Sequence, residues 1–491
     1  MKKRMVSLMV TSAFALQAAA SVSAAPVGGT IQDYEPNAIV KKNGTFWNWG
    51  VWGIAQRAVP TQVNALSGVK KAFPNRLVLK QDNTVWQWTI APQTGKATVT
   101  QVPGVSGLAF SVSSGDLIYI VDGAGAVYAI PYDSVTHEPL PSQVAKVAGL
   151  EGVTDISRYS ESDATQWREQ WLFLKKDGTV QRKLKDETTA KPVAGLSGIV
   201  DLQDNFALKN DGTVWGLPAE VANSDRNPRQ VKGLTDIQSF NAAVAIDGNS
   251  QLWYWGNTVT GWSDTTARHR QSPIRITTIN DVKAAFAVER ALLVLTNSGK
   301  LYMTSIEMEK LPANPSFKLI ASDVDNAEPE YRHLFFQKTD GSLWGVGINK
   351  NSELGYGDFE FEHWTPVPVQ KPIEVVLNDE AVELTNGVVS RSNQTFVPLR
   401  SIFEKLGAKI TWNAAEKLVT LEGGAQASDP LKITINYTTG ITTLNGKAVD
   451  TGTPPFSLAG TSYLPLRFVS EQLGAKVDWN QQEEKINITY K

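Results

Sequence analysis

The chain has 491 residues, which is more than one ordinary domain contains. A hydrophobic fraction of 42% and a charged fraction of 20% are typical of a folded protein rather than a disordered one. The 47 basic residues are balanced by 49 acidic ones, so the chain has no excess of positive charge with which to bind a nucleic-acid backbone. Because there is no cysteine, disulfides, thiolate metal ligands and cysteine nucleophiles are excluded.

The N-terminus has the pattern of a secretory signal peptide. A basic stretch over residues 2–4 precedes an apolar run over residues 5–20, and small residues precede a predicted cleavage after Ala24. The apolar run is shorter than the roughly 20 residues that a membrane-spanning helix needs. We therefore expect residues 1–24 to be removed, and the mature protein to be secreted or associated with a bacterial cell surface without a transmembrane segment.

From Ala38 onward one pattern recurs: an apolar strand, a turn of the Lys-x-Asp-Gly-Thr type and a second strand rich in Trp. Asp-Gly and Asn-Gly pairs between β-rich runs are strong hairpin signals. Eight such hairpins begin at Ala38, Leu77, Leu117, Trp171, Phe206, Ala243, Leu292 and Leu334. Between them a second phrase, of which QVNALSGVKKAF from Gln62 is an example, supplies two more short strands. Four strands per unit predict the blades of a β-propeller.

The repeat resembles that of the RCC1 (regulator of chromosome condensation) family. The resemblance rests on phrases such as FALKNDGTVWGL from Phe206 and on GVGINKNSELGYGDF over residues 345–359, with His333 where the family often has a histidine. It implies a mainly β fold with an RCC1-like β-propeller over residues 25–370. Family propellers usually have seven blades and this chain has eight hairpins, so we expect seven or eight blades. The nuclear members bind histones and act on a small GTPase, activities that an exported chain without a basic face is not expected to share.

The recurring tryptophans are expected to pack between neighbouring blades, because strand alternation places Trp47 and Trp49 on one face. Stacking of a sugar or a protein partner on them is the alternative. Binding is expected instead where the repeat is lengthened, in the loops over residues 158–170 and 257–272. The candidate binding residues in these loops are Trp167, Trp262, Arg268, His269 and Arg270.

Residues 371–491 contain a tandem duplication with a constant offset (465 − 398 = 67). Pairs at this offset include Pro398/Pro465, Arg400/Arg467, Gly407/Gly474 and Trp412/Trp479. The segment PLRSIFEKLGAK predicts a short helix that begins after Pro398 and ends at Gly407, with strands on both sides. Each copy is thus predicted to be a small α+β unit, and the two tandem repeats to form an α+β C-terminal domain. Trp412 and Trp479 are expected to close its core.

The duplicated phrase resembles the copper amine oxidase N-terminal domain, a stalk-like module of exported bacterial proteins. The resemblance covers about residues 374–490 and implies no amine oxidase activity, because the oxidase chemistry belongs to a separate domain with three histidines around copper. Residues 371–491 contain no histidine, so copper ligation of the usual kind is not expected. The pairs Arg400–Glu404 and Arg467–Glu471, each four residues apart, are expected to be helix-surface ion pairs rather than catalytic groups.

No catalytic motif, metal site or cofactor site is evident in the sequence. The stretch SDVDNAEPE could offer Asp323, Asp325 and Asn326 to Ca²⁺, but it lacks the Gly and the final Glu of an EF-hand loop, and we interpret it as a solvated loop. We therefore expect a non-catalytic binding or scaffold protein. Its propeller would recognise an extracellular protein or a cell-wall glycan, and its C-terminal domain would act as a stalk or surface attachment.

Two alternatives remain open from the sequence. One is a secreted proteinaceous enzyme inhibitor that acts through propeller loops, since a secreted bacterial family with the same repeat inhibits β-lactamase in this way. The other is a carbohydrate-active enzyme whose catalytic carboxylates the sequence does not single out.

Overall fold

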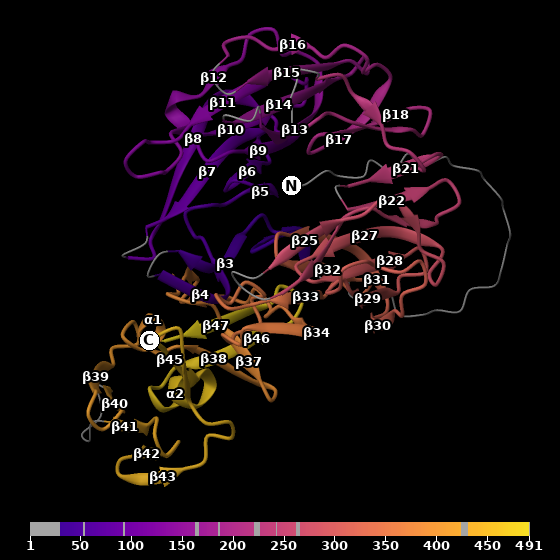
Figure 1. Ribbon diagram of the computed structural model, residues 1–491. Helices are drawn as coiled ribbons and strands as arrows, with labels where there is room; N and C mark the ends of the chain where they lie inside the picture. The colour runs from indigo at the N-terminus through magenta and orange to yellow at the C-terminus, as the bar shows by residue number, and fades with distance from the viewer. Residues whose placement is uncertain are drawn as a thin grey trace, which may run out of the picture.

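The computed structural model describes residues 30–490 except 53–54, 92–93, 163–165, 185–186, 220–225, 242, 262–265 and 424–430. The predicted signal peptide over residues 1–24 lies outside these described residues. Within them, no helix is long and apolar enough to cross a membrane. The chain consists mainly of β-strands, which form a propeller and a smaller C-terminal domain (Figure 1).

Eight four-stranded antiparallel sheets, the blades, follow one another in the part of the propeller that the structure describes. The first four contain β1–β4 (Ile31–Glu35, Ala38–Lys41, Phe46–Trp52, Ala55–Gln62), β5–β8 (Val69–Phe73, Leu77–Lys80, Thr84–Ile90, Ala97–Ser106), β9–β12 (Phe110–Ser113, Leu117–Val121, Val127–Pro131, Ala145–Lys146) and β13–β16 (Val153–Ser162, Trp167–Lys175, Val180–Leu184, Lys191–Pro192). The last four contain β17–β20 (Ile199–Gln203, Phe206–Lys209, Val214–Gly216, Arg229–Gln230), β21–β23 with β26 (Ile237–Phe240, Val244–Asp247, Leu252–Tyr254, Ile274–Arg275), β27–β30 (Val282–Val288, Ala291–Thr296, Leu301–Ser305, Lys318–Ala321) and β31–β34 (Val324–Glu330, His333–Lys338, Leu343–Ile348, Glu362–Pro368).

Two short elements interrupt this pattern. The hairpin of β24 (Asn257–Thr260) and β25 (Ala267–Arg270) is inserted between β23 and β26 of the sixth blade. The 3₁₀-helix η1 (Pro141–Gln143) precedes the last strand of the third blade.

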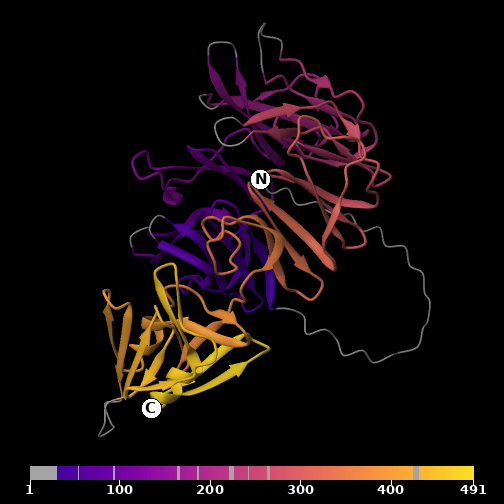
Figure 2. The same ribbon diagram turned by 60° about the horizontal axis from the view of Figure 1, so that its bottom comes forward.

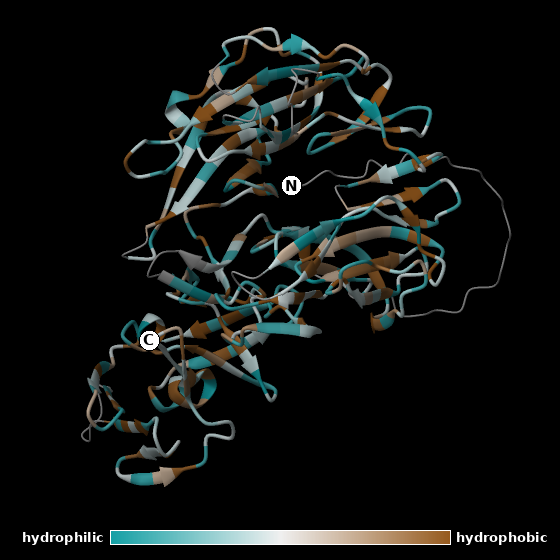
Figure 3. Ribbon diagram, viewed as in Figure 1, coloured by the Kyte–Doolittle hydropathy of each residue, from teal (hydrophilic) through white to brown (hydrophobic). Residues whose placement is uncertain are grey.

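The blades form a closed ring, because an apolar core lies between every two neighbours. Phe46 and Trp88 pack between the first and second blades, with ring centroids 5.2 Å apart. The last interface joins the eighth blade to the first, where Phe335 meets Trp49 at 5.8 Å. Apolar segments accordingly recur along the propeller strands (brown in Figure 3). The eight predicted hairpins therefore correspond to eight blades, which decides between the seven and eight that the sequence allowed.

Side-chain hydrogen bonds within each turn explain the Lys-x-Asp-Gly-Thr-x-Trp phrase. In the second blade the Asp82 carboxylate accepts from the Thr84 amide (2.9 Å) and hydroxyl (2.6 Å), and the hydroxyl accepts from the Trp86 indole N–H (2.8 Å). The Lys80 ammonium lies 4.4 Å from the centre of the Trp86 ring. The hydrogen bonds from Thr84 lower the pKa of Asp82. The first Trp of each pair therefore covers its own turn.

The second Trp of the pair packs against the preceding blade. Trp88 lies in the core between the first and second blades, and Trp255 in the core between the fifth and sixth. Trp47 and Trp49 lie together in the core between the eighth and first blades, which confirms that strand alternation places them on one face.

The described part of the C-terminal domain contains three sheets and two short helices. Its elements are β35 (Glu374–Leu377), β36 (Glu380–Ala381), β37 (Val389–Arg391), β38 (Gln394–Pro398), α1 (Leu399–Phe403), β39 (Lys409–Asn413), β40 (Leu418–Gly423), β41 (Leu431–Asn436), β42 (Thr442–Leu444), β43 (Lys447–Val449), β44 (Phe456–Leu458), β45 (Thr461–Pro465), α2 (Leu466–Gln472), β46 (Lys476–Asn480) and β47 (Lys485–Thr489). The sheet orders are β36-β35-β47-β46, β37-β38-β45-β44 and β39-β40-β41-β42-β43.

The two repeats interlock around a pseudo-two-fold axis. In the middle sheet Val397 lies opposite Leu464, its own equivalent (464 − 397 = 67), so the axis passes between them. The last hairpin of the second repeat joins the first hairpin of the first repeat through the parallel pair β35 and β47. Leu406 and Leu473, which are also equivalent, belong to one core. The repeats are therefore halves of one domain and not two separate units.

Trp412 and Trp479 do not close this core, so that expectation is wrong. Their side chains are 47% and 43% exposed. Each Trp precedes an asparagine that begins the hairpin turn, as in Asn413, whose side-chain oxygen accepts from the Ala415 amide at 3.1 Å. The tryptophans therefore lie at hairpin ends that extend past the core. Of the two expected ion pairs, Arg400–Glu404 is present at 4.0 Å on the exposed surface of the α1 region, whereas Arg467 and Glu471, both described, do not come within ion-pair distance.

The C-terminal domain packs against the outer side of the first blade (Figure 2). Ala58 and Val59 of β4 share a core with Phe396, Leu458 and Tyr463 of the middle sheet. The contact is close, because a Cβ on Gly387 would lie 1.9 Å from the Pro60 carbonyl oxygen.

Polar contacts surround this apolar centre. Lys41, whose side chain is buried, donates to the carbonyl oxygens of Glu483 (2.6 Å) and Pro372 (3.2 Å) and lies 3.7 Å from the Glu484 carboxylate. Burial lowers the pKa of Lys41, and the carboxylate of Glu484 opposes that shift. The domain is thus held on the propeller by both apolar and charged contacts.

The substitution Gly387→Ala should weaken this docking, because the added methyl group has no room beside Pro60. We expect a loss of about 1–3 kcal/mol in the free energy of unfolding, as for other overpacked sites. Calorimetry and limited proteolysis of the segment between the domains would measure it. Gly115→Ala is the matched control, since nothing lies within 4 Å of the added Cβ. Identical melting and cleavage of the two variants would contradict this docking.

His333 is a buried neutral base at the start of β32. It is 5% exposed, its ring meets Phe335 edge-to-face at 5.4 Å, and neither ring nitrogen has a hydrogen-bond partner among the described residues. Burial lowers the pKa of His333 to about 4, and the Glu353 carboxylate only partly offsets this effect. The unfolded chain takes up the proton near the ordinary value of about 6.5, so acid favours the unfolded state.

Stability should therefore fall as the pH drops from about 6.5 toward about 4, by about 3 kcal/mol from this one residue. Urea unfolding at pH 7.5 and pH 4 measures the loss in the wild type and in His333→Asn, which cannot take up this proton. The variant should lose less stability on acidification than the wild type, whereas His137→Asn at an exposed turn should lose as much. An equal loss in all three proteins would refute the assignment.

Candidate functional site

Neighbouring strands of a blade run in opposite directions, so the two faces of the propeller carry different connections. The first and third strands of each blade end at one face, which carries the long connections β11–β12, β23–β26, β29–β30 and β33–β34. We call this the insertion face. The opposite face carries the tight turns of the repeat, such as Asp82–Thr84. Recognition residues on a rigid scaffold are usually found in such long connections.

Exposed apolar side chains gather on the insertion face. Among the described propeller residues, five of the seven most exposed large apolar side chains lie in its connections or, in the case of Trp167, at the strand end beside one. They are Val135 (84%), Trp167 (68%), Tyr331 (81%), Phe359 (39%) and Phe361 (54%). The remaining two are Val200 and Leu319. Exposed aromatic groups of this kind are typical of binding surfaces.

The first strands of the blades line the centre of the ring. Asp33 of β1 accepts a hydrogen bond from the Ala72 amide of β5 at 3.0 Å, and Asp155 of β13 accepts one from the Leu202 amide of β17 at 3.0 Å. These hydrogen bonds join the first strands of neighbouring blades, so the first strands must lie near the central axis of the propeller.

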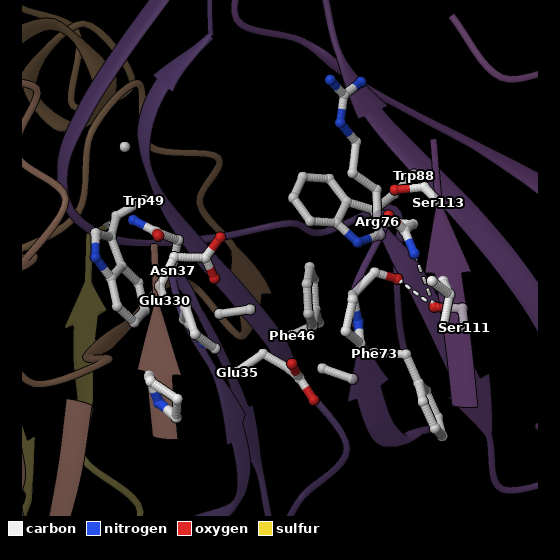
Figure 4. A pocket seen from close by; sticks show the side chains of 18 of the residues that line it. Glu35, Asn37, Phe46, Trp49, Phe73, Arg76, Trp88, Ser111, Ser113 and Glu330 are labelled. Carbon is white, nitrogen blue, oxygen red and sulfur yellow. Dashed lines mark hydrogen bonds between the residues drawn. The ribbon is translucent and has the colours of Figure 1, made fainter. Parts of the chain in front are cut away.

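A cavity of about 470 Å³ opens where these central strands end on the insertion face (Figure 4). Its lining includes the aromatic rings of Phe46 and Trp88, and the carboxylates of Glu35 and Glu330 come from the first and eighth blades. Arg76, which also lines it, pairs with Glu138 at 2.8 Å.

The polar side chains of this cavity are held in place. Arg158 pairs with Glu169 at 3.4 Å, and Asn75 donates to the Ser111 hydroxyl at 3.0 Å, which in turn donates to the Pro74 carbonyl at 2.9 Å. No histidine lines the cavity, and the described residues contain no group of three or more His, Asp or Glu that could hold a metal ion. The arrangement suits binding of a polar group beside aromatic rings.

A second cavity, of about 770 Å³, lies between the β24–β25 hairpin and the seventh and eighth blades. Arg268 of the hairpin lines it, together with Arg290, Arg332, Phe361 and Trp364. Among the predicted binding residues that the structure describes, Arg268 alone lines one of these two cavities.

The other predicted residues have different surroundings. His269 lies 2.9 Å from the Thr260 hydroxyl within the hairpin. The Arg270 guanidinium stacks on Trp255 (5.4 Å) and Phe206 (5.1 Å), although the residue as a whole is exposed. Trp262 lies outside the described residues.

Trp167 is strongly exposed at the start of β14 and lines neither cavity. It belongs to the fourth blade and Arg268 to the hairpin of the sixth, so the candidate residues do not form one site. Tyr331, Phe361 and Trp364 were not predicted from the sequence. The sequence does contain a signal for two of them. Phe361 and Trp364 directly follow the Gly-rich stretch of the eighth blade, where a connection between strands is expected.

The structure thus defines an eight-bladed β-propeller with an appended α+β domain. Residues 376–488 match the family model of the copper amine oxidase N-terminal domain, in agreement with the resemblance seen in the sequence. Comparison with curated proteins gives no match.

Several solved structures are similar at low sequence identity. Prp20p from Saccharomyces cerevisiae, the yeast RCC1, gives a TM-score of 0.41 at 14% identity, covering 68% of this chain and 88% of that one. Human WBSCR16 gives 0.40 at 14% identity over 56% and 84% of the two chains. BamB from Moraxella catarrhalis gives 0.34 at 11% identity over 63% and 96%. The propeller fold of this chain rests on its own eight sheets and their circular packing.

Arg270 should act as an anchor of the β24–β25 hairpin. Arg270→Ala removes the stacking on Trp255 and Phe206, which is worth about 0.5–1 kcal/mol for an exposed arginine. We expect faster amide hydrogen exchange confined to β24 and β25, measured by mass spectrometry. The control Arg275→Ala removes an exposed hydrogen bond to Gln251 and should leave this exchange unchanged. Equal exchange in both variants would show that Arg270 is not an anchor.

Proposed function

We propose that this is an exported bacterial binding protein without catalytic activity. Its propeller presents the insertion face to an extracellular macromolecule, and its C-terminal domain supports or attaches the propeller at the cell surface. The observation that supports this most directly is the difference between the two faces. Long connections and exposed aromatic side chains gather on one, and tight turns with internally satisfied side chains make up the other.

Physical considerations favour binding through side chains such as Trp167 and Tyr331. Large aromatic groups lose little conformational entropy on binding and bury a large apolar area, so they dominate the energy of many interfaces. The closed ring keeps the connections that carry them in place, which lowers the ordering cost that binding would otherwise incur.

The docked C-terminal domain supports a role in setting orientation. Because it is packed on the first blade through Val59, Phe396 and Tyr463, it would hold the insertion face at a constant angle to whatever the domain contacts. A flexible tether would not have this property. The export signal over residues 1–24 is consistent with this location.

Co-sedimentation of the full mature chain with isolated bacterial cell walls tests the proposal. We expect the protein to pellet, and the variant Val135→Ser/Trp167→Ser/Tyr331→Ser to bind at least tenfold more weakly, because its apolar contacts on the insertion face are lost. The matched control Val200→Ser/Leu319→Ser changes the exposed apolar residues outside that face and should bind like the wild type. If the wild type stays soluble, attachment to the cell wall is refuted. If both variants bind equally well, recognition does not use the insertion face.

A further inference from the structure

The larger cavity has the size and rigidity of a ligand site. Its volume of about 770 Å³ lies within the range of about 300–1,000 Å³ that is usual for ligand pockets. The β24–β25 hairpin forms one wall and is fastened to the seventh blade. There the Thr258 hydroxyl donates to the Glu309 carbonyl (2.7 Å) and the Val259 amide to the Ile306 carbonyl (3.0 Å). The wall is therefore in place before any ligand arrives.

Two ion pairs hold charged groups along the lining. Arg332 pairs with Glu289 through two hydrogen bonds of 2.9 and 3.1 Å, and Arg290 pairs with Glu307 at 2.9 Å. A guanidinium has five N–H donors and a carboxylate about four acceptor sites, so each pair retains capacity for further hydrogen bonds. Such paired groups can bind hydroxyl groups, which both donate and accept.

Arg268 and Glu362 also line the cavity, and within the described residues neither has an ion-pair partner. Together with the two pairs they give three arginines and three glutamates, so the net charge of the lining is zero (3 − 3 = 0). A ligand with a large net charge of either sign gains little in such a site. A neutral ligand with many hydroxyl groups can use both the donors and the acceptors.

Aromatic rings supply the remaining surface. Phe361 is 54% exposed and Trp364 of β34 is half-buried, and both line the same cavity. The flat C–H faces of a sugar ring pack well on such rings, because the burial of apolar surface then leaves the hydroxyl groups free for hydrogen bonds. We propose that this cavity binds a neutral oligosaccharide. The inference rests on the proposed function, since it assigns a ligand class to one site on the same face.

Isothermal titration calorimetry of the full mature chain tests the ligand class. The probes are cellohexaose, chitohexaose, maltohexaose and xylohexaose, with hexagalacturonate and the hexamer of glucosamine as charged counterparts. We expect at least one neutral hexamer to bind, and to bind at least tenfold more tightly than either charged hexamer. If no neutral hexamer binds, or if a charged one binds more tightly, the inference is overturned.

Two pairs of variants locate the site. Arg268→Ala and Phe361→Ala should each weaken binding of the neutral hexamer at least tenfold. Arg275→Ala and Trp412→Ala change exposed side chains outside the lining and away from the insertion-face connections, and as controls they should leave the affinity within twofold of the wild type. Equal affinity of all four variants would place the sugar elsewhere.

The cell-wall experiment changes Val135, Trp167 and Tyr331, which are not part of this lining, so the two proposals can fail separately. Cell-wall binding without hexamer binding refutes only the sugar site. Hexamer binding without cell-wall binding refutes only attachment to the wall.

Discussion

The architecture depends on the contact that joins the eighth blade to the first. Trp49 and Asn37 of the first blade both donate to the carbonyl oxygen of Glu353, at 2.7 and 3.0 Å. A Cβ on Gly355 would lie 2.8 Å from the Trp49 indole nitrogen, so only glycine allows the loop to approach this closely. Each blade buries its apolar faces on two neighbours, and an open ring would leave two such faces in water.

The same loop explains the Gly-rich stretch of the eighth blade. Asn349 organises it, because its side chain accepts from the Leu354 amide (3.0 Å) and donates to Asp358 (2.7 Å). The loop then reaches the C-terminal domain, where the Gly357 carbonyl accepts from Arg391 at 3.1 Å. Ring closure and docking of the C-terminal domain therefore meet at the first blade, which makes this blade the structural link between the two domains.

The repeat turns and the connections between strands have different roles in the propeller. The polar side chains of the Asp-Gly-Thr-x-Trp turns form hydrogen bonds with one another. The face that these turns form therefore has few polar groups left for recognition. The connections on the insertion face are free of that constraint and differ from blade to blade. This explains why the exposed aromatic residues and both cavities lie there.

Local patterns in the sequence were enough to predict the hairpins, the shared face of Trp47 and Trp49 and the helical segments after Pro398 and Pro465, because turn residues and strand alternation act over a few positions. The duplication likewise predicted an α+β domain. It did not predict that Val397 would pair with Leu464, or that the first hairpin of one repeat would join the last hairpin of the other.

The sequence by itself therefore determined the repeating unit, the turns and the duplication. Only the tertiary structure decided the number of blades, the docking at Gly387 and the grouping of Arg268 with Phe361 in one cavity. It also showed that Trp412 and Trp479 lie past the core. These features depend on contacts between distant segments, such as Trp49 and Glu353, which are 304 residues apart. Whether such segments meet is decided by how all the blades pack in a closed ring, which no local pattern specifies.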